Sequence, residues 1–115
     1  IDKPGHGLPQ LDAVAVESYE RFNVGSIEFM AIPVYHGDNL IAGYRFGTCA
    51  YITDVSNIQL EKNGKYLEGL DVLILGALRE KPHPTHYSFS QAAEVARQIG
   101  AKANILYSYK SLSFP

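Results

Sequence analysis

The sequence predicts an α/β fold built on one mixed β-sheet. In the first half of the chain, apolar and aromatic runs are joined by short turn signals, a pattern typical of β-hairpins. In the second half, the continuous apolar run DVLILGAL (71–78) is followed by an amphipathic helix at 89–99 and a last apolar run at 103–109. A helix between two strands favours a β-α-β unit with parallel strands, so hairpins and parallel strands should share one sheet.

The predicted hairpins begin within residues 13–34, where apolar and polar side chains alternate. Two strands there flank a turn at 23–26, in which Gly25 can take a positive φ. The chain then continues through a strand that ends at His36, a loop at 37–39, and two strands at 40–46 and 49–52 joined by a two-residue turn.

Two ionisable side chains stand at the ends of these strands. His36 ends the first of the three strands, and Asp54 follows the last one. If the strands are neighbours in one sheet, an imidazole and a carboxylate leave the same end of it. Such a pair can bind a metal ion or transfer a proton, and the spacing alone does not choose between these roles.

The second half of the chain contains the best-defined helix. We expect a short helix at 66–69, and then a central strand at 71–78 that is covered on both faces because it is a continuous run of leucine and β-branched residues. The helix Phe89–Ile99 should start at a capping box formed by Ser88 and Gln91, and Gly100 should end it.

Composition narrows the class of protein. With 115 residues, 46% of them hydrophobic and 19% charged, residues 1–115 fit a single globular domain, in which 1–12 read as a loop or a truncated linker. The net charge of -2 offers no basic footprint for nucleic acid. The single cysteine, Cys49, excludes an intrachain disulfide and is expected to be a buried thiol in a reducing compartment. No apolar run is long enough to span a membrane, so we expect a cytoplasmic protein without membrane contact.

Several spaced blocks resemble a known family. The blocks PVYHG, GYRFG, YITDVS, LEGLDVLILGALR and HPTHYSFSQAAEVARQIGAK resemble the metallo-β-lactamase superfamily, and within it the cyclic-phosphodiesterase type of metal-dependent hydrolase, relatives of the phosphonate-pathway phosphoribosyl cyclic phosphodiesterase. The resemblance covers most of this chain but only the C-terminal half of the family's domain. It implies that the chain forms half of a four-layer αββα sandwich.

The resemblance also implies site residues. It makes His36 and Asp54 metal ligands, with the Asp54 carboxylate bridging two divalent ions, zinc or manganese. In similar enzymes the position of His86 lies near the substrate, where a histidine can protonate the leaving group. Paired metals would activate a water and orient a phosphodiester.

Three departures from the family pattern affect the expected activity. The superfamily's His-x-His-x-Asp-His motif belongs to the half that precedes the matched region, and Ser108 occupies the place of the family's last histidine ligand. Gly76 stands where relatives carry an aspartate. We therefore expect a fragment or partner half of a metal-dependent phosphodiesterase-type hydrolase that is inactive alone and holds no metal, or holds it weakly. The alternative is a non-catalytic interaction or structural module derived from the same fold.

The predicted architecture also bears on partners. One helix can shield only part of one sheet face, and the other face would remain apolar and exposed. We therefore expect a homo-oligomer, or a partner chain that supplies the missing half. A small phosphodiester would be the substrate if the assembled protein is active.

Overall fold

The computed structural model describes residues 10–11, 13–77 and 85–108. It contains one six-stranded sheet in the order β1-β2-β3-β4-β5-β6. Strands β1 to β4 are antiparallel neighbours, and β4, β5 and β6 run parallel, so the predicted mixed sheet is confirmed. The elements are β1 (Arg21–Val24), β2 (Ile27–His36), β3 (Asn39–Phe46), β4 (Cys49–Ile52), α1 (Leu60–Asn63), the 3₁₀ helix η1 (Gly64–Leu67), β5 (Val72–Gly76), α2 (Phe89–Ile99) and β6 (Ala103–Tyr107).

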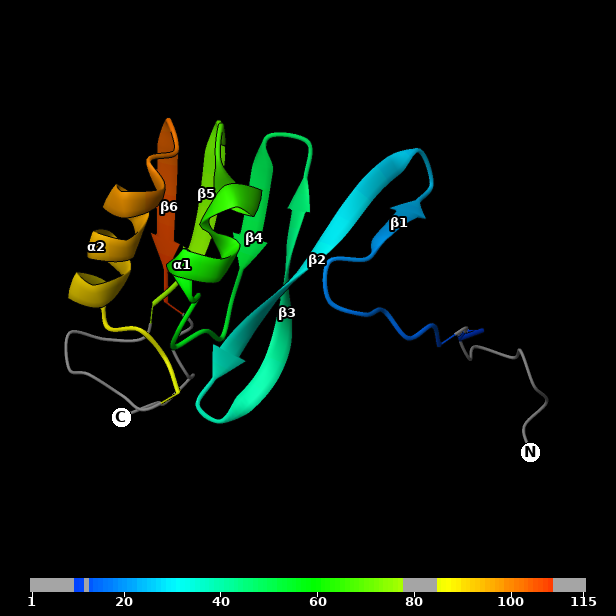
Figure 1. The fold of residues 1–115 in the computed structure, drawn as a ribbon, viewed down its shortest axis with the longest axis horizontal. Coiled ribbons are helices and arrows are strands. Elements are labelled where there is room, and N and C mark those ends of the chain that lie inside the picture. Colours follow the sequence, from blue (N-terminus) through cyan, green and yellow to red (C-terminus); the bar gives the residue numbers. More distant parts are fainter. Residues whose placement is uncertain (1–9, 12, 78–84, 109–115) are drawn as a thin grey trace, which may run out of the picture.

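The helices lie on one side of the sheet (Figure 1). α2 lies beside β5 and β6, α1 lies in front of the strands next to them, and the β1–β2 hairpin projects away from both helices. The hydrophobic core forms between the helices and the sheet. Its members are Ile32, Val34, Ala50, Ile52, Val55, Ile58, Leu67, Leu70, Leu73, Leu75, Ala77, Tyr87, Ala92 and Ala96.

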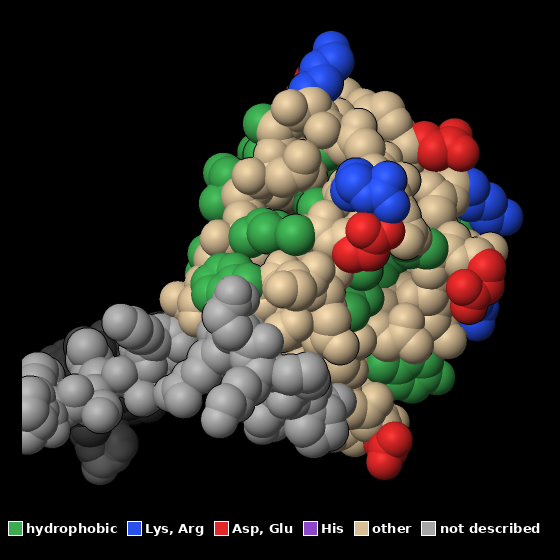
Figure 2. All heavy atoms as spheres, turned by 90° about the vertical axis from the view of Figure 1, so that its left-hand side faces the viewer, with side chains coloured by type: hydrophobic (Ala, Val, Ile, Leu, Met, Phe, Trp, Pro, Cys, Tyr) green, Lys and Arg blue, Asp and Glu red, His purple; other side chains and the backbone are tan. Residues whose placement is uncertain are grey.

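The opposite side of the sheet is covered by no helix in the part of the chain that the structure describes (Figure 1). Because side chains alternate along a strand, the residues between the core positions point to this side. We call this side the open face; its large side chains are Phe29, Tyr44, Phe46, Cys49, Tyr51, Ile74, Ile105 and Tyr107. Figure 2 shows hydrophobic side chains along the margin away from the helices, and charged side chains toward the helix side.

The best-defined sequence predictions are confirmed. α2 spans Phe89–Ile99, and the reciprocal hydrogen bonds between Ser88 and Gln91 form the predicted capping box. Gly100 ends the helix with φ 76°, a left-handed conformation that glycine adopts without steric cost. β3 and β4 also occupy their predicted places around a two-residue turn.

The N-terminal strand prediction is partly wrong. Only Arg21 and Phe22 of the first expected strand belong to β1, and the other two residues of β1, Asn23 and Val24, were expected in the turn. The described residues before β1 make a turn of their own, in which Glu20 N–H donates to Glu17 C=O at 3.0 Å. Tyr19 has φ 65° and turns its ring to the helix side, where it stacks on Tyr66 with ring centroids 4.6 Å apart. The turn at Tyr19, whose ring packs on Tyr66, therefore lies where the sequence predicted a strand.

The short helix lies earlier than predicted. α1 and η1 occupy the stretch from Leu60 to Leu67, and the side chain of Asn63 between them is fully buried. Its amide nitrogen donates to Pro33 O at 2.8 Å and to Ile58 O at 2.6 Å, and its amide oxygen accepts from the Tyr19 hydroxyl at 2.6 Å. Asn63 is thus a buried anchor between helix and sheet.

Two further expectations are corrected. β5 is an interior strand, but it lies next to β6 at one side of the sheet rather than in the middle, and its open face is only half-buried. Cys49 lies on the open face and is half-buried rather than fully buried, because no described helix covers that side. No helix in the described ranges has both the length and the apolar character that crossing a membrane requires.

Candidate functional site

One edge of the sheet collects the carboxyl ends of four strands. β2 is antiparallel to β3 and β3 is antiparallel to β4, so β2 points the same way as β4, β5 and β6. His36 is the last residue of β2, Asp54 follows β4, and His86 lies just before α2. The structure therefore brings all three predicted site residues to one edge.

The three side chains are close together. The His36 and His86 rings meet edge to face, with centroids 4.9 Å apart and planes at 87°. The Nε2 atom of His86 lies 3.4 Å from Asp54 Oδ1, and its Nδ1 atom lies 2.9 Å from the Thr85 hydroxyl. The side chain of His86 is 26% exposed and that of Asp54 is 73% exposed, so a solute can reach the carboxylate.

The backbone at Asp54 is held in an uncommon conformation. Its φ of 53° lies in the left-handed region, which is unfavourable for a residue with a Cβ. The loop that follows is fixed to the end of β2, because the Ser56 hydroxyl accepts from Gly37 N–H at 2.9 Å and donates to Tyr35 O at 3.2 Å. Tyr35 also pairs with Asn57 as an isolated β-bridge. These bonds stabilise the strained turn that aims the carboxylate at the sheet edge.

Tyr87 connects the loop of His86 to the loop of Asp54. Its backbone N–H donates to Val55 O at 2.8 Å, and its hydroxyl accepts from Ile58 N–H at 2.9 Å. Burial raises the pKa of the Tyr87 phenol, so the ring stays neutral in the core. Sequence reasoning missed Tyr87 and Ser56, and a serine or tyrosine in a loop gives no signal of such a role.

The open face contributes two phenols to the same edge. Tyr51 of β4 and Tyr107 of β6 have their hydroxyl oxygens 3.4 Å apart. Partial burial, the neighbouring Tyr51 and the negative charge of Asp54 raise the pKa of Tyr107 to about 12, although a hydrogen bond with Thr53 acts in the opposite direction. Asp54 therefore contacts His86 on the helix side and is one cause of the raised pKa of Tyr107 on the open side.

The site as described does not provide a complete metal centre. Across residues 10–11, 13–77 and 85–108, no group of three or more histidine, cysteine, aspartate or glutamate side chains is arranged to hold a metal ion. A catalytic zinc normally has three protein ligands. The roles inferred from the family, with His36 and Asp54 as ligands and His86 as a catalytic acid, stay predictions.

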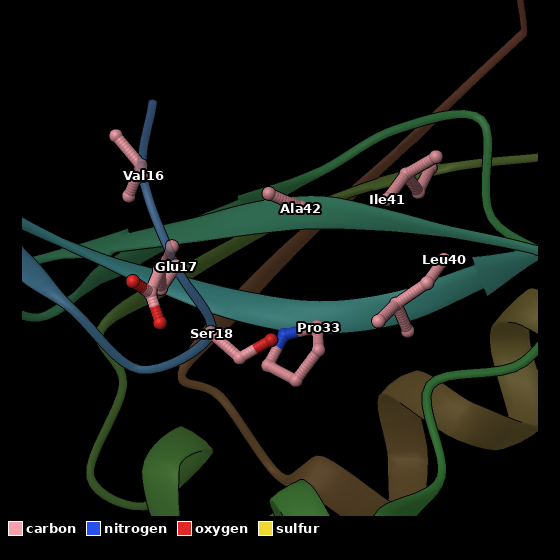
Figure 3. Close-up of a pocket in the computed structure, with 8 residues that line it drawn as sticks. Val16, Glu17, Ser18, Pro33, Leu40, Ile41 and Ala42 are labelled. Carbon is pink, nitrogen blue, oxygen red and sulfur yellow. The ribbon is translucent and has the colours of Figure 1, made fainter. Parts of the chain in front are cut away.

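One cleft lies away from this edge cluster. It has a volume of about 180 Å³ and forms where the segment before Tyr19 crosses β2 and β3 (Figure 3). Its lining contains one carboxylate and otherwise mostly small or apolar side chains, so it offers little chemistry. The lining residues are Val16, Glu17, Ser18, Ala31, Pro33, Leu40, Ile41 and Ala42.

A comparison with models of protein families shows to which superfamily this chain belongs. Residues 1–107 match the model of the family described as the beta-lactamase superfamily domain. The chain belongs to the beta-lactamase superfamily. The predicted resemblance and the predicted fold, a mixed sheet that forms half of the superfamily's sandwich, are thereby confirmed.

Two relatives of this superfamily member give more detail. A crystal structure described as a new diphosphatase from the PhnP family superposes with a TM-score of 0.73 at 40% identity, over 78% of this chain and 35% of that chain. An octanoyltransferase of Porphyromonas gingivalis is 31% identical over 104 residues, which is 90% of this chain and 21% of that protein. The chain thus spans about a third of the first relative and a fifth of the second.

Proposed function

We propose that this chain supplies the C-terminal half of the active site of a phosphoesterase-type hydrolase that acts on phosphodiester-like substrates. The observation that carries the proposal is the meeting of His36, Asp54 and His86 at the carboxyl edge of the sheet. The 40% identity to a diphosphatase supports the same class of reaction. The chain's own fold supports a hydrolase-like protein of the beta-lactamase superfamily.

His86 is suited to handle a proton in such a reaction. One ring nitrogen faces the Thr85 hydroxyl and the other faces the Asp54 carboxylate, so each protonation state of the ring has a partner. A positioned imidazole can protonate the leaving oxygen of a phosphoester. The partly exposed ring leaves room for a substrate.

The divalent metal that the resemblance implies, zinc or manganese, would need ligands beyond this part of the chain. His36 and Asp54 are suitable donors, but they are too few to hold a catalytic ion on their own. We therefore expect weak zinc or manganese binding by the isolated chain. Metal analysis after dialysis should find less than one ion per chain, and two tightly held ions would contradict the expectation.

The open face indicates where the other half would pack. Tyr51, Ile105 and Tyr107 are 42%, 51% and 36% exposed, and soluble monomers rarely expose an apolar patch larger than a few hundred Å². We propose that a second sheet covers this face, supplied by the remaining part of the domain in the same chain or in a partner chain. A stable interface of this kind buries on the order of 1,000 Å² or more.

Light scattering and a charged variant test this packing. A purified chain with an uncovered face should associate with itself or bind a hydrophobic dye, and Ile105→Lys should weaken both. Arg97→Ala on the charged surface of α2 serves as the control. A monomer that binds no dye would contradict the packing proposal, whereas a stable dimer would identify a second copy as the covering layer.

Activity is tested by supplying the missing half. The 115-residue chain should not hydrolyse bis(p-nitrophenyl) phosphate alone, and should do so with manganese or zinc after mixing with the complementary part of the diphosphatase relative. His86→Ala should then lower kcat by about 100-fold or more, the typical contribution of a general acid. The control is Asp71→Asn at the opposite sheet edge, where the carboxylate binds Thr48 and Lys102.

The alternative function remains a non-catalytic module of the same fold. The absence of a complete ligand group in the described residues favours it. If the two halves form a complex that binds metal but shows no turnover, the module is the better description. If His36→Ala, Asp54→Asn and His86→Ala all lose turnover while the complex still forms, the hydrolase is established.

A further inference from the structure

One short loop makes contact with the chain beside all three site residues. Residues 55–58 follow Asp54 directly, and on one side they bond to the end of β2, whose last residue is His36. On the other side they bond to Tyr87, the residue after His86. We call residues 55–58 the linking loop. The distances between the two imidazoles and the carboxylate depend on how this loop is held.

The Ser56 side chain holds the chain on both sides of His36. Its hydroxyl oxygen accepts a hydrogen bond from the N–H of Gly37 at 2.9 Å and donates its own proton to the carbonyl oxygen of Tyr35 at 3.2 Å. Gly37 directly follows His36, and Tyr35 directly precedes it. Because Ser56 lies only two residues after Asp54, this single hydroxyl fixes the backbone of one site residue relative to that of the other.

Backbone bonds would keep the linking loop attached to β2 without that hydroxyl. The N–H of Tyr35 donates to the Asn57 carbonyl at 2.9 Å. The Tyr35 carbonyl accepts from the N–H groups of Ser56 at 2.7 Å and of Asn57 at 3.3 Å. Removing the hydroxyl therefore affects mainly the N–H of Gly37. The backbone attaches the loop, and the hydroxyl adds a fixed position for the turn after His36.

Tyr87 holds the opposite side of the linking loop. Its backbone N–H donates to the Val55 carbonyl at 2.8 Å, and its hydroxyl accepts from the N–H of Ile58 at 2.9 Å. Val55 is the residue after Asp54, so these bonds fix the loop of the carboxylate against the loop of His86, whose ring lies 3.4 Å from it. All three bonded residues belong to the core on the helix side, so a layer on the open face would leave these bonds in place.

We infer that Ser56 and Tyr87 are positioning residues of the proposed active site. Through the linking loop, Ser56 sets where His36 lies relative to Asp54. Tyr87 sets in the same way where His86 lies. The inference rests on the proposed function and adds two residues that act through others and do not touch the reacting atoms. A misplacement of about 1 Å at a reacting group costs on the order of 100-fold in rate, so such bonds matter for turnover.

NMR spectroscopy of the 115-residue chain at one fixed pH tests the inference without metal or turnover. The rings of His36 and His86 meet edge to face with centroids 4.9 Å apart, so the π electrons of one ring should displace the proton resonances of the other. Ser56→Ala and Tyr87→Phe should each reduce this displacement, because each loosens one side of the linking loop. Unchanged histidine resonances in a variant would overturn the positioning role of the residue that it replaces.

Three further variants serve as controls. Ser56→Thr keeps the hydroxyl and should keep the histidine resonances of the parent chain. Thr48→Val removes a hydroxyl that donates to Asp71 at 2.8 Å at the opposite sheet edge, and should leave them in place. Tyr66→Phe removes a phenol hydroxyl on the helix side from a ring that stacks on Tyr19, and should also leave them in place. The amide resonances of α2 report whether each variant is folded.

Kinetics of the reconstituted enzyme distinguish the two positioning residues. Ser56→Ala should lower kcat by about tenfold on both bis(p-nitrophenyl) phosphate and diphenyl phosphate, and Ser56→Thr should restore it. Tyr87→Phe should lower kcat about tenfold more on diphenyl phosphate than on the nitrophenyl ester. Phenolate is the poorer leaving group and depends more on protonation by His86. Equal losses on the two esters in Tyr87→Phe would overturn its assigned role.

The two experiments separate this inference from the proposed function. If the reconstituted protein shows no turnover, reduced ring displacement in Ser56→Ala and Tyr87→Phe still supports the positioning roles, and only the hydrolase fails. If the parent turns over substrate and both variants match it in kcat on both esters, the inference is overturned and the hydrolase stands. The same holds if Thr48→Val lowers kcat as much as Ser56→Ala does.

Discussion

The two faces of the sheet are built from the same strands but differ sharply in burial. On the helix side, Ile52, Leu73 and Leu75 are 0% exposed. On the open face, Tyr51 and Ile105 are 42% and 51% exposed, although β4 and β5 carry apolar residues at nearly every position on both sides. A strand that is apolar on both faces is typical of a sheet with layers on both sides.

This difference explains why β5 was expected to be covered twice. The apolar run DVLILGAL suits a strand with a layer packed on each face of its sheet. The helices α1 and α2 supply only one of these two layers. The residues of the covered face are buried against these helices. The open face carries the half-exposed side chains that we propose a second layer buries.

The largest expected effect contrasts one core residue with one open-face residue. Leu73→Ala removes a fully buried side chain and should lower the free energy of unfolding by about 2–5 kcal/mol. Ile105→Ala removes a half-exposed side chain and should lower it by less than about 1 kcal/mol. Urea unfolding followed by circular dichroism measures both. Equal losses would show that the open face is buried in solution.

The second expected effect concerns the polar anchor of the covered face. Asn63→Ala leaves the carbonyl oxygens of Pro33 and Ile58 without their donor, inside a fully buried environment. We expect a loss of roughly 1–3 kcal/mol in the free energy of unfolding, the cost of an unsatisfied buried polar group. Asn39→Ala, at the exposed first residue of β3, is the control and should change it by less than about 0.5 kcal/mol.

The third expected effect is smaller and concerns the helix that forms the cover. Ser88→Ala removes the side chain that accepts from Gln91 N–H at 3.2 Å, and should lower the unfolding free energy by about 1 kcal/mol. Ser90→Ala, two residues further on an exposed part of α2, should be neutral or slightly stabilising, because alanine is the better helix former. A stabilising Ser88→Ala would show that the capping box contributes nothing to α2.

The sequence correctly predicted the elements whose ends are determined by residues close to them in the chain. The capping box and Gly100 fix both ends of α2, and a two-residue turn fixes the register of β3 and β4. α1 was misplaced because Asn63 makes its decisive bond with Pro33, 30 residues away, and no local pattern reports that contact.

In the candidate site, too, some features follow from the local sequence and others depend on contacts between distant residues. Strand direction alone placed His36 and Asp54 at one sheet edge, and the structure agrees. That His86 would come within 3.4 Å of Asp54 depends on Tyr87, which links two loops through Val55 and Ile58. The Tyr51–Tyr107 contact likewise joins two strands that are separated by β5, and a pattern of alternating apolar residues does not distinguish a paired phenol from a packed one.

The last prediction uses pH to compare the tyrosines of the two faces. The pKa of Tyr107 is raised to about 12, and an unfolded tyrosine titrates near 10, so the folded chain holds this proton more tightly. The stabilisation is fully present below pH of about 10 and is lost as the pH rises through about 12, because the unfolded chain then releases its proton first. Absorbance at 295 nm should show the late titration, and Tyr107→Phe should remove it. Tyr51→Phe should make Tyr107 titrate at lower pH, since Tyr51 contributes to the raised pKa.

Covering the open face should move the Tyr107 titration to higher pH. It should leave the titration of Tyr87 unchanged, because Tyr87 is already buried in the core on the helix side. A Tyr107 titration that does not respond to association would place the second layer somewhere other than on this end of the sheet.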